Sequence, residues 1–174
     1  WMRTAVRGHE NPALDVALSL GRGLDLPVFV YHALSERYPY ASDRHHTFIL
    51  EGARDVAAEL AARGIAYAFH LERPGREGPH LHTLAGTAAV VVTEDFPVAP
   101  IAGWTEALAA AAPCPVLAVD TACVVPMRLV PKRPDRAFRY RDMTASARAE
   151  RLPRGWDEQP DPDAPHAPGD LPFE

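Results

Sequence analysis

Four short apolar runs alternate with longer segments of helical periodicity, and this alternation constrains the fold more than any other feature of the chain. The runs are rich in residues that favour strands, and they cover residues 26–33, 65–71, 88–93 and 115–119. Continuous apolar runs of this length predict strands that are covered on both faces of a sheet. Alternation with helices predicts a parallel sheet with right-handed crossovers. We therefore expect a three-layer, doubly wound α/β fold.

The segments between the runs carry helix signals at their ends. Asn11 and Pro12 predict the N-cap and first residue of a helix that continues to Gly21. Further helices are expected over residues 79–85 and 100–112.

A longer helix is expected from Asp43, as its cap, to about Arg63, with Gly64 ending it. Its inward face is predicted to carry Phe48, Ile49, Val56 and Leu60.

The helix that starts at residue 12 needs a strand before it, and Trp1 to Arg3 can only be the end of that strand. We therefore predict a Rossmann-like, five-stranded parallel sheet whose first strand is truncated and lies mostly upstream of residue 1.

Length and composition limit the class of protein. A chain of 174 residues with 47% hydrophobic residues can build a core without disulfides or metal. Cys114 and Cys123 are its only cysteines and form no CxxC pair, which is typical of a reducing compartment. No apolar run reaches the roughly 20 residues of a membrane span, and the first residues do not read as a signal peptide. A cytoplasmic domain without membrane or metal partners is expected.

Charge and proline separate the chain into two parts. Residues 152–174 hold six acidic side chains against one basic one, and six of the eighteen prolines. This composition predicts an extended acidic linker after a domain of residues 1–151. The domain has no net charge, so its composition does not by itself indicate DNA binding.

Several local motifs are weak. Gly21-Arg22-Gly23 follows a helix, whereas a dinucleotide fingerprint links a strand to a helix, and no GxxxxGK[ST] loop occurs. The pairs His45-His46 and His80-Leu81-His82 have no obvious third metal ligand, so a solvated or amphipathic face is the preferred interpretation.

The predicted carboxyl ends of the strands are the better candidates for a ligand site, because ligands of open α/β sheets bind there. Residues 3–7, 32–35, 93–96 and 120–123 lie at these ends. Glu94 and Asp95 offer acceptors, and Phe48, Phe96 and Trp104 offer walls for an aromatic ligand. The alternative is a capped turn at residues 93–97 with the aromatic side chains in the core.

Several segments together resemble the photolyase/cryptochrome family, over about residues 1–150. The opening Trp1-Met2-Arg3 with Asn11-Pro12-Ala13-Leu14 is similar to the family's first strand end and helix start. Residues 44–52 (RHHTFILEG) resemble a helix of the class II group, and Val119-Asp120 with Val124-Val125-Pro126 resembles its VD…VP segment. Thr93-Glu94-Asp95 stands where the family has a TD-type strand end.

This resemblance implies the N-terminal α/β domain of a class II-like deoxyribodipyrimidine photolyase. Such an enzyme is a lyase that splits cyclobutane pyrimidine dimers in DNA with light and reduced FAD. FAD and damaged DNA would be bound by a helical C-terminal domain, toward which Leu171-Pro172-Phe173 leads. We expect no catalytic residues in this chain and no repair by these residues alone.

The resemblance also implies an antenna chromophore in this domain, with 8-hydroxy-5-deazaflavin as the expected molecule. The residues expected to bind it are His32, Leu34, His45, Phe48, Ile49, Glu94 and Asp95. Two other functions stay open: a cryptochrome-like blue-light receptor domain, and a free-standing small-molecule or nucleotide-binding α/β module.

Overall fold

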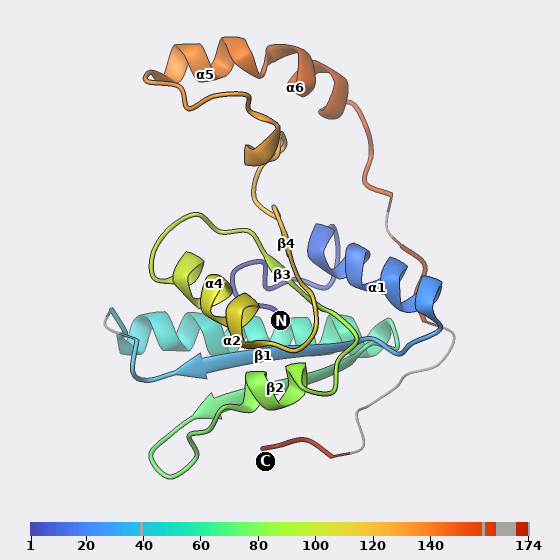
Figure 1. Cartoon of the computed structure of the whole chain (residues 1–174), viewed down its shortest axis with the longest axis vertical. Helices are drawn as coiled ribbons and strands as arrows, with labels where there is room; N and C mark the ends of the chain where they lie inside the picture. Colours follow the sequence, from blue (N-terminus) through green and yellow to red (C-terminus); the bar gives the residue numbers. More distant parts are fainter. Residues whose placement is uncertain (39, 158, 163–169, 174) are drawn as a thin grey trace.

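Four strands form the centre of the molecule, which a computed structural model describes for residues 1–38, 40–157, 159–162 and 170–173 (Figure 1). Strand β1 (Phe29–Ser35) pairs in parallel with β2 (Ala66–Glu72), in the register Phe29 to Ala66. Strand β3 (Val91–Glu94) pairs in parallel with β4 (Val116–Val119). All four apolar runs are therefore strands, and the predicted parallel α/β class is confirmed.

The residues Trp1 to Arg3 join the two strand pairs. Met2 forms a parallel bridge with His32 of β1, and its amide donates to the carbonyl of Tyr31 at 2.9 Å. On the other side, the amino group of Trp1 donates to the carbonyl of Val92 in β3 at 2.8 Å. The spatial order is thus β2, β1, residues 1–3, β3, β4. Only a single bridge stands at the centre of this order. The described residues therefore hold four strands, and the expected fifth strand is not confirmed.

Helices cover both faces of the strands and complete the three layers. On one face, α1 (Pro12–Leu24) and α2 (Asp43–Ala62) pack on Met2 and Val30 through Leu14, Leu18, Val56 and Leu60. On the other face, α3 (His80–Ala85) and α4 (Ile101–Ala111) pack on Val91 and Val116 through Ala85 and Leu108.

Helix α1 begins as predicted and ends later. The Asn11 side chain accepts from the amides of Ala13 and Leu14, as an N-cap does. The helix continues beyond Gly21. That glycine lies against the segment before β1, where a Cβ at position 21 would stand 2.5 Å from Cγ2 of Val28. It ends where Asp25 adopts a left-handed conformation, with φ of 54°.

Helix α2 differs from the prediction at its start. Ser42 is the N-cap and accepts from the amide of His45, so Asp43 is the first helical residue. The prediction that Phe48 faces inward is wrong, because its side chain is 74% exposed. The buried residues Ala53, Val56 and Leu60 define a stripe that extends back to Ile49, and Phe48 is rotated about 100° from that stripe.

A cavity of about 350 Å³ lies at the amino ends of β1 and β3. Its walls are mostly apolar and come from both helical layers as well as from the strands. They include Trp1, Ala17, Phe29, Leu84 and Val91. Trp1 forms part of its wall, together with residues of β1 and β3 from the two strand pairs.

Residues 127–151 form helices that the sequence analysis did not predict. They are the short 3-10 helix η1 (Met127–Leu129), α5 (Ala137–Met143) and α6 (Ala145–Arg151). In Figure 1 they stand apart from the three layers, beyond the end of β4.

The acidic segment 152–174, where it is described, returns to the body of the molecule. Trp156 and Gln159 donate to the carboxylate of Asp15 in α1, and Asp161 pairs with Arg63 at 2.6 Å. The ring of Phe173 lies 5.5 Å from that of Tyr31. Residues 158, 163–169 and 174 of the predicted linker lie outside the described residues. Within the described part of the chain, no helix combines the length and apolarity that a membrane span requires.

Candidate functional site

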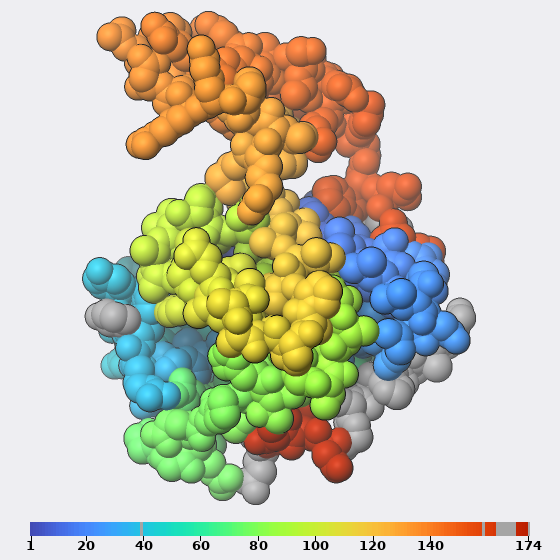
Figure 2. Space-filling view, viewed as in Figure 1, coloured from blue at the N-terminus to red at the C-terminus, as the bar shows by residue number. Residues whose placement is uncertain are grey.

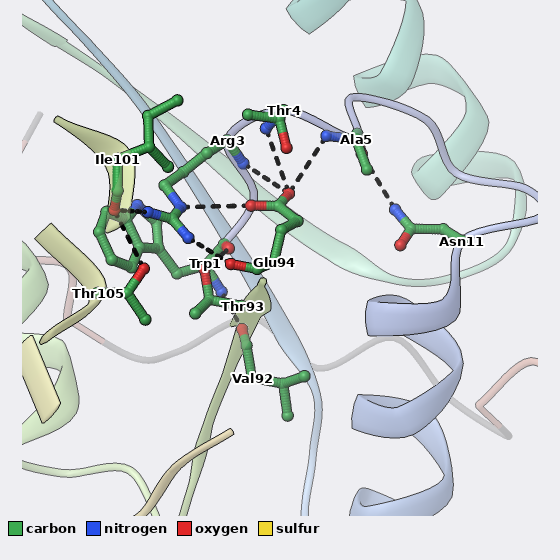
Figure 3. Close-up of polar contacts among 10 residues, drawn as sticks. All are labelled: Trp1, Arg3, Thr4, Ala5, Asn11, Val92, Thr93, Glu94, Ile101 and Thr105. Atoms are coloured by element: carbon green, nitrogen blue, oxygen red, sulfur yellow. Dashed lines mark hydrogen bonds and ion pairs between the residues drawn. The ribbon is translucent and has the colours of Figure 1, made fainter. Parts of the chain in front are cut away.

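A buried ion pair stands at the carboxyl end of β3. Glu94 is 2% exposed, and its Oε2 lies 3.3 Å from Nε of Arg3, whose side chain is 8% exposed (Figure 3). The Arg3 guanidinium also donates to the carbonyls of Glu94 and Ile101, at 2.7 and 3.1 Å. It lies 4.2 Å from the centre of the Trp1 ring, in a cation–π contact. These contacts tie the first residues of the chain to β3 and α4.

The second oxygen of Glu94 receives backbone amides. Its Oε1 accepts from the amides of Arg3 at 2.9 Å and of Thr4 and Ala5 at 3.3 Å each. Figure 3 shows these donors converging on one carboxylate. With the bond from Arg3 Nε, the carboxylate accepts four hydrogen bonds from within the chain. Glu94 thus positions the turn after Trp1.

His32 of β1 forms the bridge with Met2, next to this ion pair in the chain, and is 1% exposed. Its Nδ1 is 2.9 Å from the hydroxyl of Tyr67, and its ring packs edge-on against Phe69 at 5.0 Å. Burial lowers the pKa of His32 to about 4, although the charge of Glu94 opposes the shift. The imidazole is therefore neutral at physiological pH. Burial likewise raises the pKa of Tyr67.

An aromatic cluster lies at the carboxyl end of β1, and we call its residues Tyr38, Tyr40, His45 and Trp104 the aromatic rim. The ring of Tyr38 is central, at 5.6 Å from Tyr40, 5.9 Å from His45 and 6.2 Å from Trp104. Tyr40 is 76% exposed and Trp104 44% exposed. The rim thus presents ring faces to solvent from the loop after β1, from α2 and from α4.

The other predicted ligand residues lie at different depths. Leu34 is buried, Ile49 is half-buried on α2, and Phe48 points to solvent. Asp95 pairs with Arg128 at 2.8 Å. The structure therefore brings His45 into the aromatic rim with Trp104, but it places His32 and Glu94 in the interior.

Asp120, at the end of β4, caps the loop that follows. Its carboxylate accepts from the amides of Ala122, Cys123 and Met127, at 3.0, 3.0 and 2.9 Å. Although burial opposes the effect, these hydrogen bonds lower the pKa of Asp120. Both carboxylate oxygens of Asp120 are thus engaged in holding this loop.

Two functional candidates escaped the sequence analysis. Tyr38 and Tyr40 belong to a loop, where no periodicity marks a residue as facing a site. The only signal was their position directly after a strand end, where ligands of such sheets bind. Among the residues that the structure describes, no group of three or more His, Cys, Asp or Glu side chains could hold a metal ion.

Comparisons with known proteins agree with this architecture. The family model described as DNA photolyase matches residues 1–164. A curated relative, the deoxyribodipyrimidine photo-lyase of Methanothermobacter thermautotrophicus, is 32% identical over 127 residues. The match covers 73% of this chain and 28% of the relative, so the chain spans less than a third of that protein.

Proposed function

Since the chain belongs to the DNA photolyase family, we propose that it is the N-terminal α/β domain of a deoxyribodipyrimidine photolyase. The full-length protein would be a class II-like lyase that repairs cyclobutane pyrimidine dimers in DNA with light. The observation that carries this proposal is the family match over residues 1–164, together with the order of strands and helices that it covers.

In this proposal, the chemistry of repair belongs to a part of the protein that this chain does not include. The relative is more than three times as long as the matched region, which leaves room for a helical domain that binds FAD and damaged DNA. The three-layer domain would serve as its scaffold. A cytoplasmic location stays a prediction.

We further propose that the aromatic rim holds an antenna chromophore. When bound, a molecule such as 8-hydroxy-5-deazaflavin absorbs light and passes its excitation energy to FAD. Partly exposed rings on three different elements are suited to stack against a planar tricycle. Of the carboxylates first considered, Asp95 fits better than Glu94, whose two oxygens already accept four hydrogen bonds.

Chromophore binding is testable on this chain by fluorescence anisotropy of 8-hydroxy-5-deazaflavin. Trp104→Ala and Tyr38→Ala remove one stacking surface each and should weaken binding about tenfold. Asp95→Ala should also weaken binding. Phe138→Ala is the matched control, because Phe138 is an exposed aromatic residue on α5, outside the rim. Equal affinity of the Trp104 variant and this control would contradict the antenna site.

The assignment of repair to the rest of the protein has a separate test. These 174 residues, supplied with reduced FAD and blue light, should leave a dimer-containing oligonucleotide unrepaired, and a full-length protein should repair it. Repair by the 174 residues alone would refute this division of labour, whatever the chromophore assay shows.

A further inference from the structure

The segment of residues 127–154, which we call the basic arm, carries a charge that the chain total conceals. It holds nine basic side chains against three acidic ones, which gives a net charge of +6. Residues 1–126 hold nine basic against fourteen acidic side chains, which gives −5. Without Arg154, which lies beyond residue 151, the arm contributes +5. The neutrality of the predicted domain of residues 1–151 is therefore the sum of an acidic body and a basic extension.

The acidic side chains of the arm are all paired within it. Asp135 lies 3.3 Å from Arg139, Asp142 lies 3.3 Å from Arg141, and Glu150 lies 2.7 Å from Arg154. A fourth arginine, Arg128, pairs with Asp95 of the body. The positive charge that remains is carried by the other basic residues of the arm: Lys132, Arg133, Arg136, Arg148 and Arg151.

Four of these five residues present their charge to solvent. Lys132, Arg133, Arg136 and Arg151 are exposed, and none has an acidic partner within the described part of the chain. Arg148 is half-buried and donates to the carbonyl of Arg141, which stiffens the junction of α5 and α6. Guanidinium groups without a partner are suited to bidentate bonds with phosphate oxygens.

The arm also has the right shape to contact an extended polyanion. Figures 1 and 2 show it projecting from the body, with α5 and α6 following each other along its outer side. Together the two helices extend about 22 Å. Double-stranded DNA presents on the order of a dozen phosphate charges over that length. The exposed rings of Phe138 and Tyr140 stand between the arginines of α5.

We propose that the basic arm binds the phosphate backbone of nucleic acid without reading its sequence or requiring damage. Eight of its nine basic residues are arginine, and they are distributed over η1, α5, α6 and the segments that connect and follow them. This arrangement suits a regular row of phosphates better than a folded acidic protein. The site lies apart from the aromatic rim and depends neither on a chromophore nor on the repair reaction.

The test is binding of an undamaged, labelled DNA duplex of about 20 base pairs in the dark, measured by anisotropy between roughly 50 and 200 mM salt. The logarithm of the binding constant should fall linearly with the logarithm of the salt concentration. A triple variant K132Q/R133Q/R136Q should reduce that slope by up to about 2.7, because each lost phosphate contact removes about 0.9.

The matched control is R44Q/R54Q/R73Q, which removes the same charge from exposed positions of the body. It should leave the slope nearly unchanged. An equal effect of both triple variants would overturn the proposal, because net charge alone would then explain binding. Displacement of the DNA by polyglutamate as effectively as by unlabelled DNA would also overturn it, in favour of an acidic protein partner.

Two further variants guard against a folding artefact. Arg151→Gln alone, on the other helix, should reduce the slope by about 0.9. R133K/R136K keeps the charge and should preserve most of the slope. Loss of binding in the lysine variant with an unchanged circular dichroism spectrum would contradict backbone binding by charge.

Discussion

At the carboxyl ends of the strands, both oxygens of the buried Glu94 side chain accept hydrogen bonds. At the amino ends, by contrast, strands and helices line a cavity of about 350 Å³ with mostly apolar walls. The two ends belong to the same strands and share Trp1, which contacts both. Hydrogen bonds require a narrow range of distances and angles, whereas apolar contacts are non-directional. This domain therefore fixes its geometry at the end where its candidate ligand site lies.

The largest expected effect concerns the ion pair of Glu94 and Arg3 at the carboxyl ends of the strands, which we call the polar end. Glu94→Gln removes the charge that compensates Arg3, and we expect the free energy of unfolding to fall by about 3–5 kcal/mol, because breaking a buried pair leaves the other charge uncompensated. Urea denaturation measures the change. Glu106→Gln, on the exposed side of α4, is the matched control and should have almost no effect. A loss no larger than that of the control would show that the ion pair does not fix this end.

At the same end of the strands, His32 should make the stability of the domain depend on pH. The pKa of His32 is lowered from 6.5 to about 4, so between these values the unfolded state binds a proton that the folded state does not. The contribution of His32 to stability should therefore decrease as pH falls through this window and be constant above it. Comparison of pH 7.5 with about pH 4.5 should show a loss that is roughly 2–3 kcal/mol larger in the unmodified chain than in His32→Gln.

Exposed His82 provides the control for this measurement. The variant His82→Gln should retain the full pH dependence of the unmodified chain. Identical pH profiles for the His32 variant and the unmodified chain would place the acid sensitivity elsewhere.

Replacing two alanines by leucine compares packing at the cavity with packing elsewhere. Ala17 of α1 lines the cavity, so Ala17→Leu should be nearly neutral in thermal denaturation. Ala53 of α2 is 5% exposed and does not line that cavity, so Ala53→Leu should cost about 1–3 kcal/mol through overpacking. Equal losses in both variants would mean that the amino end is as tightly packed as the rest.

The smallest expected difference concerns two helix caps. Asn11 is 3% exposed, caps α1, and also donates to the carbonyls of Ala5 and Arg7 beside the Glu94 turn. Asn11→Ala should cost about 1–2 kcal/mol, whereas Ser42→Ala, at the exposed cap of α2, should cost about 0.5 kcal/mol. Chemical denaturation of both variants measures the difference. A reversed order would show that the turn after Trp1 is held without Asn11.

The strands were predictable because each is a continuous apolar run between turn or helix signals. The helices within residues 137–151 were not predicted for the opposite reason. They bury no residue, so no apolar residues recur at helical spacing to mark a face that packs on a core. Phe48 was misplaced because a large apolar residue next to the buried stripe of α2 looks the same in sequence as one within it.

The location of the ligand site stays a prediction, and the sequence indicated only some of the residues that the structure brings together there. Strand ends pointed to one edge of the sheet, and at that edge His45 and Trp104 lie beside Tyr38 in the aromatic rim. Nothing local to Glu94 reveals that its partner is Arg3, 91 positions earlier in the chain. Net charge summed over a domain likewise cannot show that opposite charges lie in separate parts of it.

That separation of charge makes the molecule an electric dipole. The basic arm projects from an acidic body, and Asp161 of the segment that follows contacts Arg63 of that body. In the field of a polyanion, such a molecule experiences a torque that turns the arm forward before any contact forms. The orientation in which the domain arrives, and not only its affinity, would then depend on ionic strength, since a Debye length of about 8 Å at physiological salt limits how early the turn begins.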